Sequence, residues 1–145
     1  MADSDAGKLK LKTLDHIGIQ VRDVEEVIET WERTFGIGPW TIREMTHTTP
    51  EGETLTTKLA FAYTDNGVEI ELIQSIRNDF IDTHGEGLHH LGFFVNDVDE
   101  DAAKAVEQGA KVAFKGPGGN IHLDADGPGG VRFELMRRRG RVADQ

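Results

Sequence analysis

The sequence contains no cysteine, which excludes disulfide bonds and thiolate metal sites and gives no support for secretion. It has no run of about 18 apolar residues, and its start, MADSDAGKLKLK, lacks the apolar core of a signal peptide. Only 16 Lys and Arg stand against 26 Asp and Glu, so the formal net charge is −10. Because nucleic-acid binders need a basic surface, we expect no binding to nucleic acid. Without a signal peptide or a membrane-spanning run, we expect a cytoplasmic protein that does not bind membranes.

A repeated segment organises the chain. The stretch Leu14–Glu26 (LDHIGIQVRDVEE) returns as Leu88–Glu100 (LHHLGFFVNDVDE). The positions that are identical in the two copies are Leu14/Leu88, His16/His90, Gly18/Gly92, Val21/Val95, Asp23/Asp97, Val24/Val98 and Glu26/Glu100. Since 145 residues suffice for one compact core but not for two, the repeat predicts two modules that share a core.

Each copy predicts a strand that leads into a capped helix. Residues Asp15–Val21 alternate between an aliphatic face and a more polar one, as do their counterparts in the second copy. Asp23 and Asp97 then stand at helix N-cap positions, and apolar residues at helical spacing continue to Gly36 and Gly109. The side chains expected on the inner face of the second helix are Ala102, Ala105 and Val106.

Three further strands are predicted after each helix, at residues 40–45, 56–63 and 68–74 in the first copy and at 111–114, 120–124 and 131–136 in the second. The predicted fold is therefore α+β, with two tandem βαβββ modules that form a curved sheet enclosure around a metal site. Residues 13–75 form module one, 76–86 a linker helix and 87–137 module two, and together they make a single domain. A flexible N-terminal segment (1–12) and a C-terminal tail (138–145) lie outside it.

Four side chains of metal-ligand type stand at equivalent places in the repeat. The closing strands VEIELIQ and VRFELMR pair Glu71 with Glu134, just as the opening strands pair His16 with His90. A single strand histidine is more often a hydrogen-bonded core residue, but a carboxylate inside an enclosure is costly unless it is paired or bound to a metal. Two imidazoles and two carboxylates suit one divalent ion: Zn, Ni, Co, Mn or Fe.

Several other residues are candidates for a substrate pocket. Those that share the ligand-bearing strand faces are Gln20, Ile73, Phe94 and Met136. Trp40 either roofs the pocket or covers the end of the first helix. His122 either lines the pocket beside the metal site or lies on a surface hairpin. The apolar members of this set predict a small-molecule substrate with an apolar part.

These motifs resemble the vicinal oxygen chelate superfamily, in particular its glyoxalase and methylmalonyl-CoA epimerase group. The resemblance rests on the HIGI and HHLGF strand starts, the ELI segment after a hairpin and the closing FEL, and it covers about residues 13–137. It implies that His16, Glu71, His90 and Glu134 are metal ligands and that Glu134 doubles as a catalytic base. The implied enzyme is an isomerase, epimerase or lyase that acts on a small carbonyl, hydroxycarbonyl or acyl-CoA compound through a metal-stabilised enolate.

A second catalytic base is less clearly marked. Methylmalonyl-CoA epimerases carry another glutamate just before the strand that here runs from 55 to 61. The usual spacing reaches Thr54, one residue after Glu53, and a shift of one residue reverses the face of a strand. Glu44, Glu51 and Glu53 are therefore the candidates for this role.

Two other functions of the same superfamily stay open. An Fe(II) dioxygenase needs two histidines and one carboxylate, so the fourth ligand weighs against it. Bleomycin-resistance proteins bind a small molecule without catalysis and generally lack the ligand set. We expect a homodimer, because the superfamily usually buries its exposed sheet edges by pairing, and the ligands of one site come either from one chain or from both.

Overall fold

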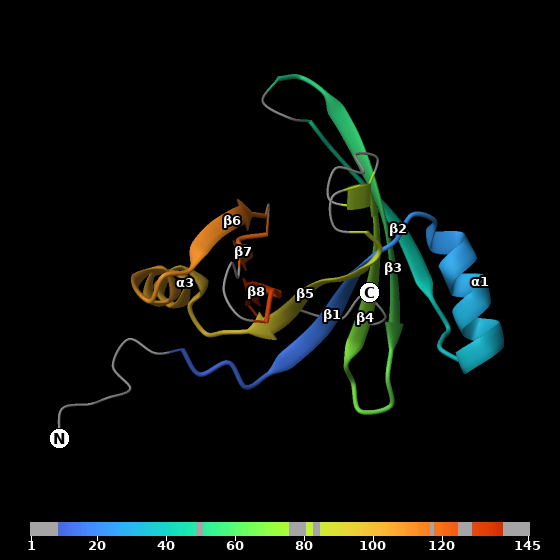
Figure 1. Cartoon of the computed structure of the whole chain (residues 1–145), viewed down its shortest axis with the longest axis horizontal. Coiled ribbons are helices and arrows are strands. Elements are labelled where there is room, and N and C mark those ends of the chain that lie inside the picture. Colours follow the sequence, from blue (N-terminus) through green and yellow to red (C-terminus); the bar gives the residue numbers. More distant parts are fainter. Residues whose placement is uncertain are drawn as a thin grey trace. The chain divides into compact units, whose positions relative to one another are not determined.

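The computed structural model describes residues 9–48, 51–75, 81–82, 85–116, 118–124 and 129–137. These residues divide into two compact units. The first unit contains residues 16–89, and the second contains 90–137 together with 9–15. The elements with described bounds are eight strands and two helices (Figure 1), which confirms the α+β class.

The first unit contains one helix and a four-stranded arrangement. Its elements are β1 (Leu14–Gln20), α1 (Val24–Phe35), β2 (Thr41–Thr48), β3 (Thr54–Tyr63) and β4 (Glu69–Ser75). The strand order is β2-β3-β4-β1, in which β1 runs parallel to β4 and the other pairs are antiparallel. This is the βαβββ plan that the first copy of the repeat predicted.

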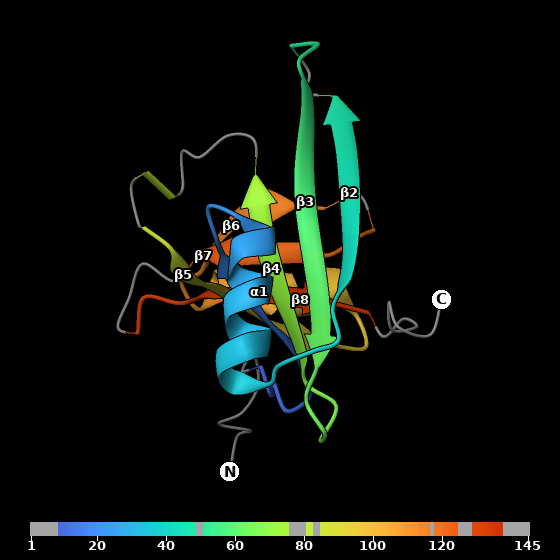
Figure 2. The ribbon, with the colours of Figure 1, turned by 90° about the vertical axis from the view of Figure 1, so that its right-hand side faces the viewer.

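Helix α1 begins and ends at the residues that the sequence marks. The Asp23 carboxylate accepts the backbone N–H of Glu26 at 3.0 Å, which satisfies one of the donors at the start of the helix. Gly36 ends it with φ 68°, a left-handed conformation that a residue without Cβ adopts at little cost. The helix packs against β3 and β4 (Figure 2) over a cluster of buried side chains: Val21, Val24, Ala60 and Leu72.

A surface ion pair also links α1 to β3. The Lys58 ammonium lies 2.7 Å from a carboxylate oxygen of Glu25. This hydrogen bond lowers the pKa of Glu25 and raises the pKa of Lys58. Exposed pairs of this kind contribute little to stability, so the apolar cluster remains the main attachment of the helix.

The second unit repeats the plan. Its elements are β5 (Gly87–Phe94), α3 (Val98–Glu107), β6 (Lys111–Lys115), β7 (Ile121–Asp124) and β8 (Arg132–Met136). The strand order is β5-β8-β7-β6, with β5 parallel to β8. The boundaries between the two units fall inside β1 and β5.

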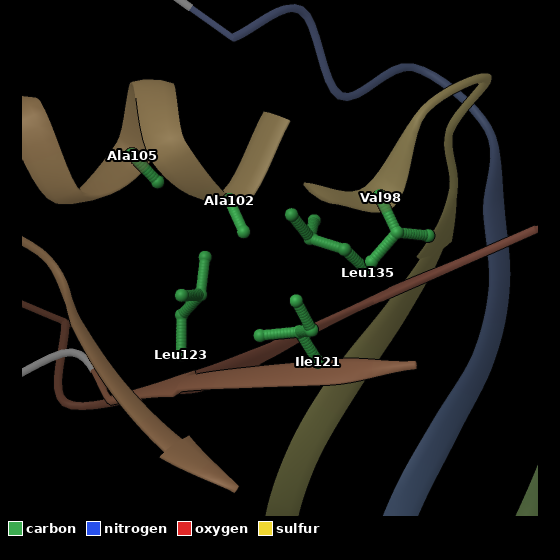
Figure 3. Close-up of a cluster of buried hydrophobic side chains, with 6 residues drawn as sticks. All are labelled: Val98, Ala102, Ala105, Ile121, Leu123 and Leu135. Carbon is green, nitrogen blue, oxygen red and sulfur yellow. The ribbon is translucent and has the colours of Figure 1, made fainter. Parts of the chain in front are cut away.

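The core of the second unit lies between α3 and strands β7 and β8. Figure 3 shows its six buried side chains: Val98, Ala102, Ala105, Ile121, Leu123 and Leu135. The prediction that Val106 faces inward is wrong, because this side chain is 46% exposed. Successive helical residues are about 100° apart, so Val106 lies about 80° around the helix from Val98, beyond the apolar stripe.

Residues 9–13 pack onto the second unit. Leu9 and Leu11 are partly buried against the α3 cluster. The backbone N–H of Phe94 donates to the carbonyl of Thr13 at 3.0 Å. The segment 1–12, expected to be flexible, thus has at least two side chains held in place by apolar contacts.

The predicted linker helix at 76–86 and the tail at 138–145 lie largely outside the described residues. Of the linker, Ile81 and Asp82 are helical, and Ile81 is buried. Among the helices of the described residues, none has the length and apolar character needed to cross a membrane.

The N-cap of α3 provides a test of these local signals. Asp97 accepts the backbone N–H of Glu100 at 3.0 Å, and Asp97→Ala should lower the free energy of unfolding by about 1 kcal/mol because this donor loses its partner. Asp97→Asn keeps an acceptor and should stay close to the parent protein. Urea denaturation of both variants measures the difference, and an equal loss for Ala and Asn would show that the carboxylate charge, not the cap, is what matters.

Candidate metal centre

The first unit holds a His–Glu pair on two adjacent parallel strands. In the register of β1 and β4, Gly18 stands opposite Glu71 and His16 opposite Glu69. The His16 Nε2 atom lies 3.6 Å from the Oε2 atom of Glu71. The histidine is 1% exposed, while the Glu71 side chain retains 16% of its exposure. An imidazole nitrogen and a carboxylate oxygen therefore converge in a largely buried place.

The second unit holds the equivalent pair. Gly92 stands opposite Glu134 in the register of β5 and β8, two residues after His90. The His90 Nε2 atom lies 3.1 Å from the Oε2 atom of Glu134. Both residues are buried, at 2% and 5% exposure. The two units thus place a histidine and a glutamate at the same strand positions, which is what the alignment of the repeat predicted.

Glu134 has two further polar neighbours. The side-chain amide of Asn120 donates to Oε1 at 2.7 Å. The Nε2 atom of His122 lies 3.7 Å from the same oxygen, and the His122 ring meets the His90 ring edge-on at 4.9 Å. His122 is only 8% exposed, so of its two interpretations the structure supports a place beside the Glu134 carboxylate.

Sequence reasoning missed Asn120. The residue stands immediately before β7, and nothing in its local pattern points to Glu134, which follows 14 positions later. The available signal was the predicted strand 120–124, whose pairing with the closing strand would have brought its first residues near that glutamate.

Glu71 has a different neighbour across its strand pair. Phe61 stands opposite Glu71 in the β3–β4 register, as His122 stands opposite Glu134 in the β7–β8 register. Phe61 is 6% exposed and brings an apolar ring where the second unit has an imidazole. The two glutamates are therefore equivalent in backbone position but not in environment.

A second carboxylate accompanies His16. Ligand-type atoms of His16 and Glu69 lie within 4.8 Å of each other. The Tyr63 hydroxyl donates to Glu69 Oε2 at 2.6 Å. Histidines that bind metals usually direct their other ring nitrogen to such a hydrogen-bonded carboxylate, which holds the ring in one orientation.

The predicted pocket residues divide into two groups. Gln20 and Met136 are each 3% exposed, while Ile73 and Phe94 are partly buried. Trp40 instead joins the α1 cluster of the first unit, where its ring centroid lies 6.2 Å from that of Trp31 and its Nε1 donates to the carbonyl of Ile37. These contacts support its second interpretation, a cover for the helix end.

The three candidates for a second base are all exposed. Glu44 lies on β2, opposite Lys58 of β3. Glu51 and Glu53 belong to the connection that precedes β3. Their carboxylates are accessible to water, and burial does not set any of the three apart from the others.

The donor atoms fit a divalent metal ion. Imidazole nitrogen and carboxylate oxygen are the ligands of Zn, Ni, Co, Mn and Fe sites. A buried carboxylate also needs a cation or hydrogen-bond donors in place of the lost water, and a divalent cation can meet this need without a proton on the neighbouring imidazole. Among the described residues, the pairs His16–Glu71 and His90–Glu134 are thus candidate ligands.

Comparison with solved structures reveals similar folds. A methylmalonyl-CoA epimerase of Streptomyces coelicolor, in complex with 2-nitronate-propionyl-CoA, is 26% identical with a TM-score of 0.62, over 90% of this chain and 100% of that one. The epimerase of Mycobacterium tuberculosis is 20% identical with a TM-score of 0.64, over 97% and 99% of the two chains. A hypothetical protein of Bacillus halodurans is 22% identical with a TM-score of 0.64, over 90% and 96%.

Sequence comparison leads to the family. The uncharacterized protein YwbC of Bacillus subtilis is 30% identical over 134 residues, which cover 88% of this chain and 98% of that protein. The family model for the glyoxalase/bleomycin resistance protein/dioxygenase superfamily matches residues 15–124, most of the chain, although Glu134 follows the matched part. The chain therefore belongs to the glyoxalase/bleomycin resistance protein/dioxygenase superfamily.

Proposed function

We propose that this protein is a metal-dependent isomerase or epimerase that moves a proton on the carbon next to a carbonyl group. The single observation that carries the proposal is the pair of buried His–Glu contacts at equivalent strand positions of the two units. His16, Glu71, His90 and Glu134 are proposed as the ligands of one divalent ion. Pure binding of a small molecule gives no reason for two such pairs.

Similar proteins support a proposal for the substrate class. Members of the superfamily generally use a divalent metal, and among the similar structures at 26–28% identity are epimerases, one of them in complex with methylmalonyl-CoA. We therefore propose an acyl-CoA thioester, or a small hydroxycarbonyl compound, as the substrate. In such compounds a carboxylate could remove the hydrogen between two carbonyl carbons, or beside one, once a metal ion stabilised the negative charge on the carbonyl oxygen.

The chemistry can be assigned to particular atoms. A bound divalent ion would supply Lewis-acid polarisation of the substrate carbonyl, which stabilises the negative charge that develops on its oxygen. Glu134 takes the proton from the adjacent carbon, and the electron pair of the broken C–H bond moves into the enolate. Return of the proton to the same or the neighbouring carbon completes the reaction. An epimerase returns it to the opposite face and requires a second proton carrier, for which Glu44, Glu51 and Glu53 are the candidates.

Removal of either histidine tests the ligand set. His16→Ala and His90→Ala should each lose most of the metal while the domain stays folded, since one of four ligands is gone. His89→Ala changes the neighbouring histidine and should keep the metal. Metal analysis of purified protein, with circular dichroism as the folding check, measures both effects. Full metal occupancy in both ligand variants would reject the assignment.

Replacement of Glu134 tests the base. Glu134→Gln still offers one oxygen to the metal but cannot accept the proton, so it should retain much of the metal and lose on the order of 100-fold or more in rate. Glu71→Gln should be milder. The measurement is turnover of methylmalonyl-CoA and related thioesters, together with exchange of the substrate proton for solvent deuterium. If Glu134→Gln exchanges that proton as fast as the parent protein, another carboxylate is the base.

We also propose that the protein is a homodimer. In the described residues β2 pairs only with β3 and β6 only with β7, so both strands are sheet edges, and Ile42 and Met45 on β2 are 46% and 49% exposed. A symmetric dimer is the commonest way to cover such edges. Light scattering over a wide concentration range should give twice the chain mass of 16.0 kDa, and a constant monomer mass would exclude the dimer.

A further inference from the structure

We propose that Asn120 is a positioning residue that holds the Glu134 carboxylate in one orientation. It anchors Oε1 and leaves Oε2 directed toward His90 and toward the metal of the proposed function. The inference rests on that proposed function and adds a residue to it: Glu134 binds the metal through one chosen oxygen.

The two oxygens of Glu134 have separate neighbours. The Asn120 amide donates to Oε1 at 2.7 Å, while Oε2 lies 3.1 Å from His90 Nε2. His122 also faces Oε1, but at 3.7 Å it lies beyond hydrogen-bond distance. The terminal torsion of a glutamate has a broad energy minimum, so a short hydrogen bond to one oxygen is an effective means of orienting the other.

The loop before β7 is built to hold this amide. The backbone N–H of Gly116 donates to the carbonyl of Asn120 at 2.8 Å, and that of Gly119 donates to the carbonyl of Gly116 at 3.2 Å. A Cβ atom on Gly116 would lie 2.1 Å from Asn120 Oδ1 and 2.7 Å from Nδ2. The Asn120 side chain therefore occupies the space that any larger residue at 116 would need.

The position of the first unit that is equivalent to Asn120 holds a residue that cannot donate. Ala60 stands opposite Leu72 as Ile121 stands opposite Leu135, so Ala60 and Ile121 are equivalent. The residues that precede them, Leu59 and Asn120, are then equivalent as well. A leucine side chain cannot donate a hydrogen bond. The duplication thus retains both glutamates but places an amide at this position in the second unit and an aliphatic side chain in the first. This difference points to a role of Asn120 that is specific to Glu134 and not to packing common to both units.

Cobalt binding gives a readout that does not depend on a substrate. The metal-free protein is titrated with Co²⁺, whose visible absorption reports the number and type of its ligands. Asn120→Ala should change the spectrum, because both oxygens of Glu134 can then reach the ion, and should weaken Co²⁺ affinity by roughly 10- to 100-fold, the usual effect of losing a partner that orients a ligand.

Two glycine variants form a matched pair. Gly116→Ala leaves residue 120 an asparagine, but the new Cβ displaces its side chain. This variant should therefore reproduce the spectral change of Asn120→Ala. Gly118→Ala adds the same methyl group 4.0 Å from Asn120 Oδ1, an ordinary contact, and should match the parent protein. Thermal unfolding of all variants checks that the fold is intact.

Asn120→Asp separates the hydrogen bond from packing. It conserves the size of the side chain but replaces the amide donor with an acceptor, so it should change the Co²⁺ spectrum as Asn120→Ala does. Parent-like spectra and affinities for Asn120→Asp and Gly116→Ala would overturn the role of Asn120 and leave the proposed function intact. A parent protein that binds no Co²⁺ would overturn both.

Discussion

The structure of this protein depends on the burial of ionisable side chains on its parallel strand pairs. Glu134 is 5% exposed and lies 3.1 Å from His90, and His16 is 1% exposed beside Glu71. Taking a carboxylate out of water costs several kcal/mol unless a cation or hydrogen-bond donors replace the lost solvent. The helices α1 and α3 pack against apolar clusters, while the strand positions of the histidines and glutamates make polar contacts.

The two units repeat one plan but give its two glutamates different surroundings. Strand register is the same in both, so each unit presents a histidine and a glutamate in the same relation. The antiparallel neighbour differs: Phe61 stands beside Glu71, whereas His122 and Asn120 surround Glu134. An apolar side chain and a hydrogen-bonding one create different environments for a carboxylate. Such differences commonly give two similar groups on one scaffold different tasks.

Membership in the superfamily agrees with this architecture but does not by itself choose a reaction. The same fold supports enzymes and binding proteins, so the reaction depends on the side chains of the site. Here the His–Glu pairs favour metal-dependent chemistry, and the Tyr63–Glu69 contact near His16 adds the kind of outer hydrogen bond that metal-binding histidines use.

The sequence by itself determined the α+β class, the helix bounds near Asp23, Gly36 and Asp97, and the pairing of the four ligand-type residues. These features could be predicted because alternation, capping and internal repetition depend only on short segments of the chain. The contact between Asn120 and Glu134, the place of Trp40 in the α1 cluster and the packing of Leu9 and Leu11 were decided only in the tertiary structure. These contacts join residues through strand register, loop closure and core packing, which depend on parts of the chain that no local pattern connects.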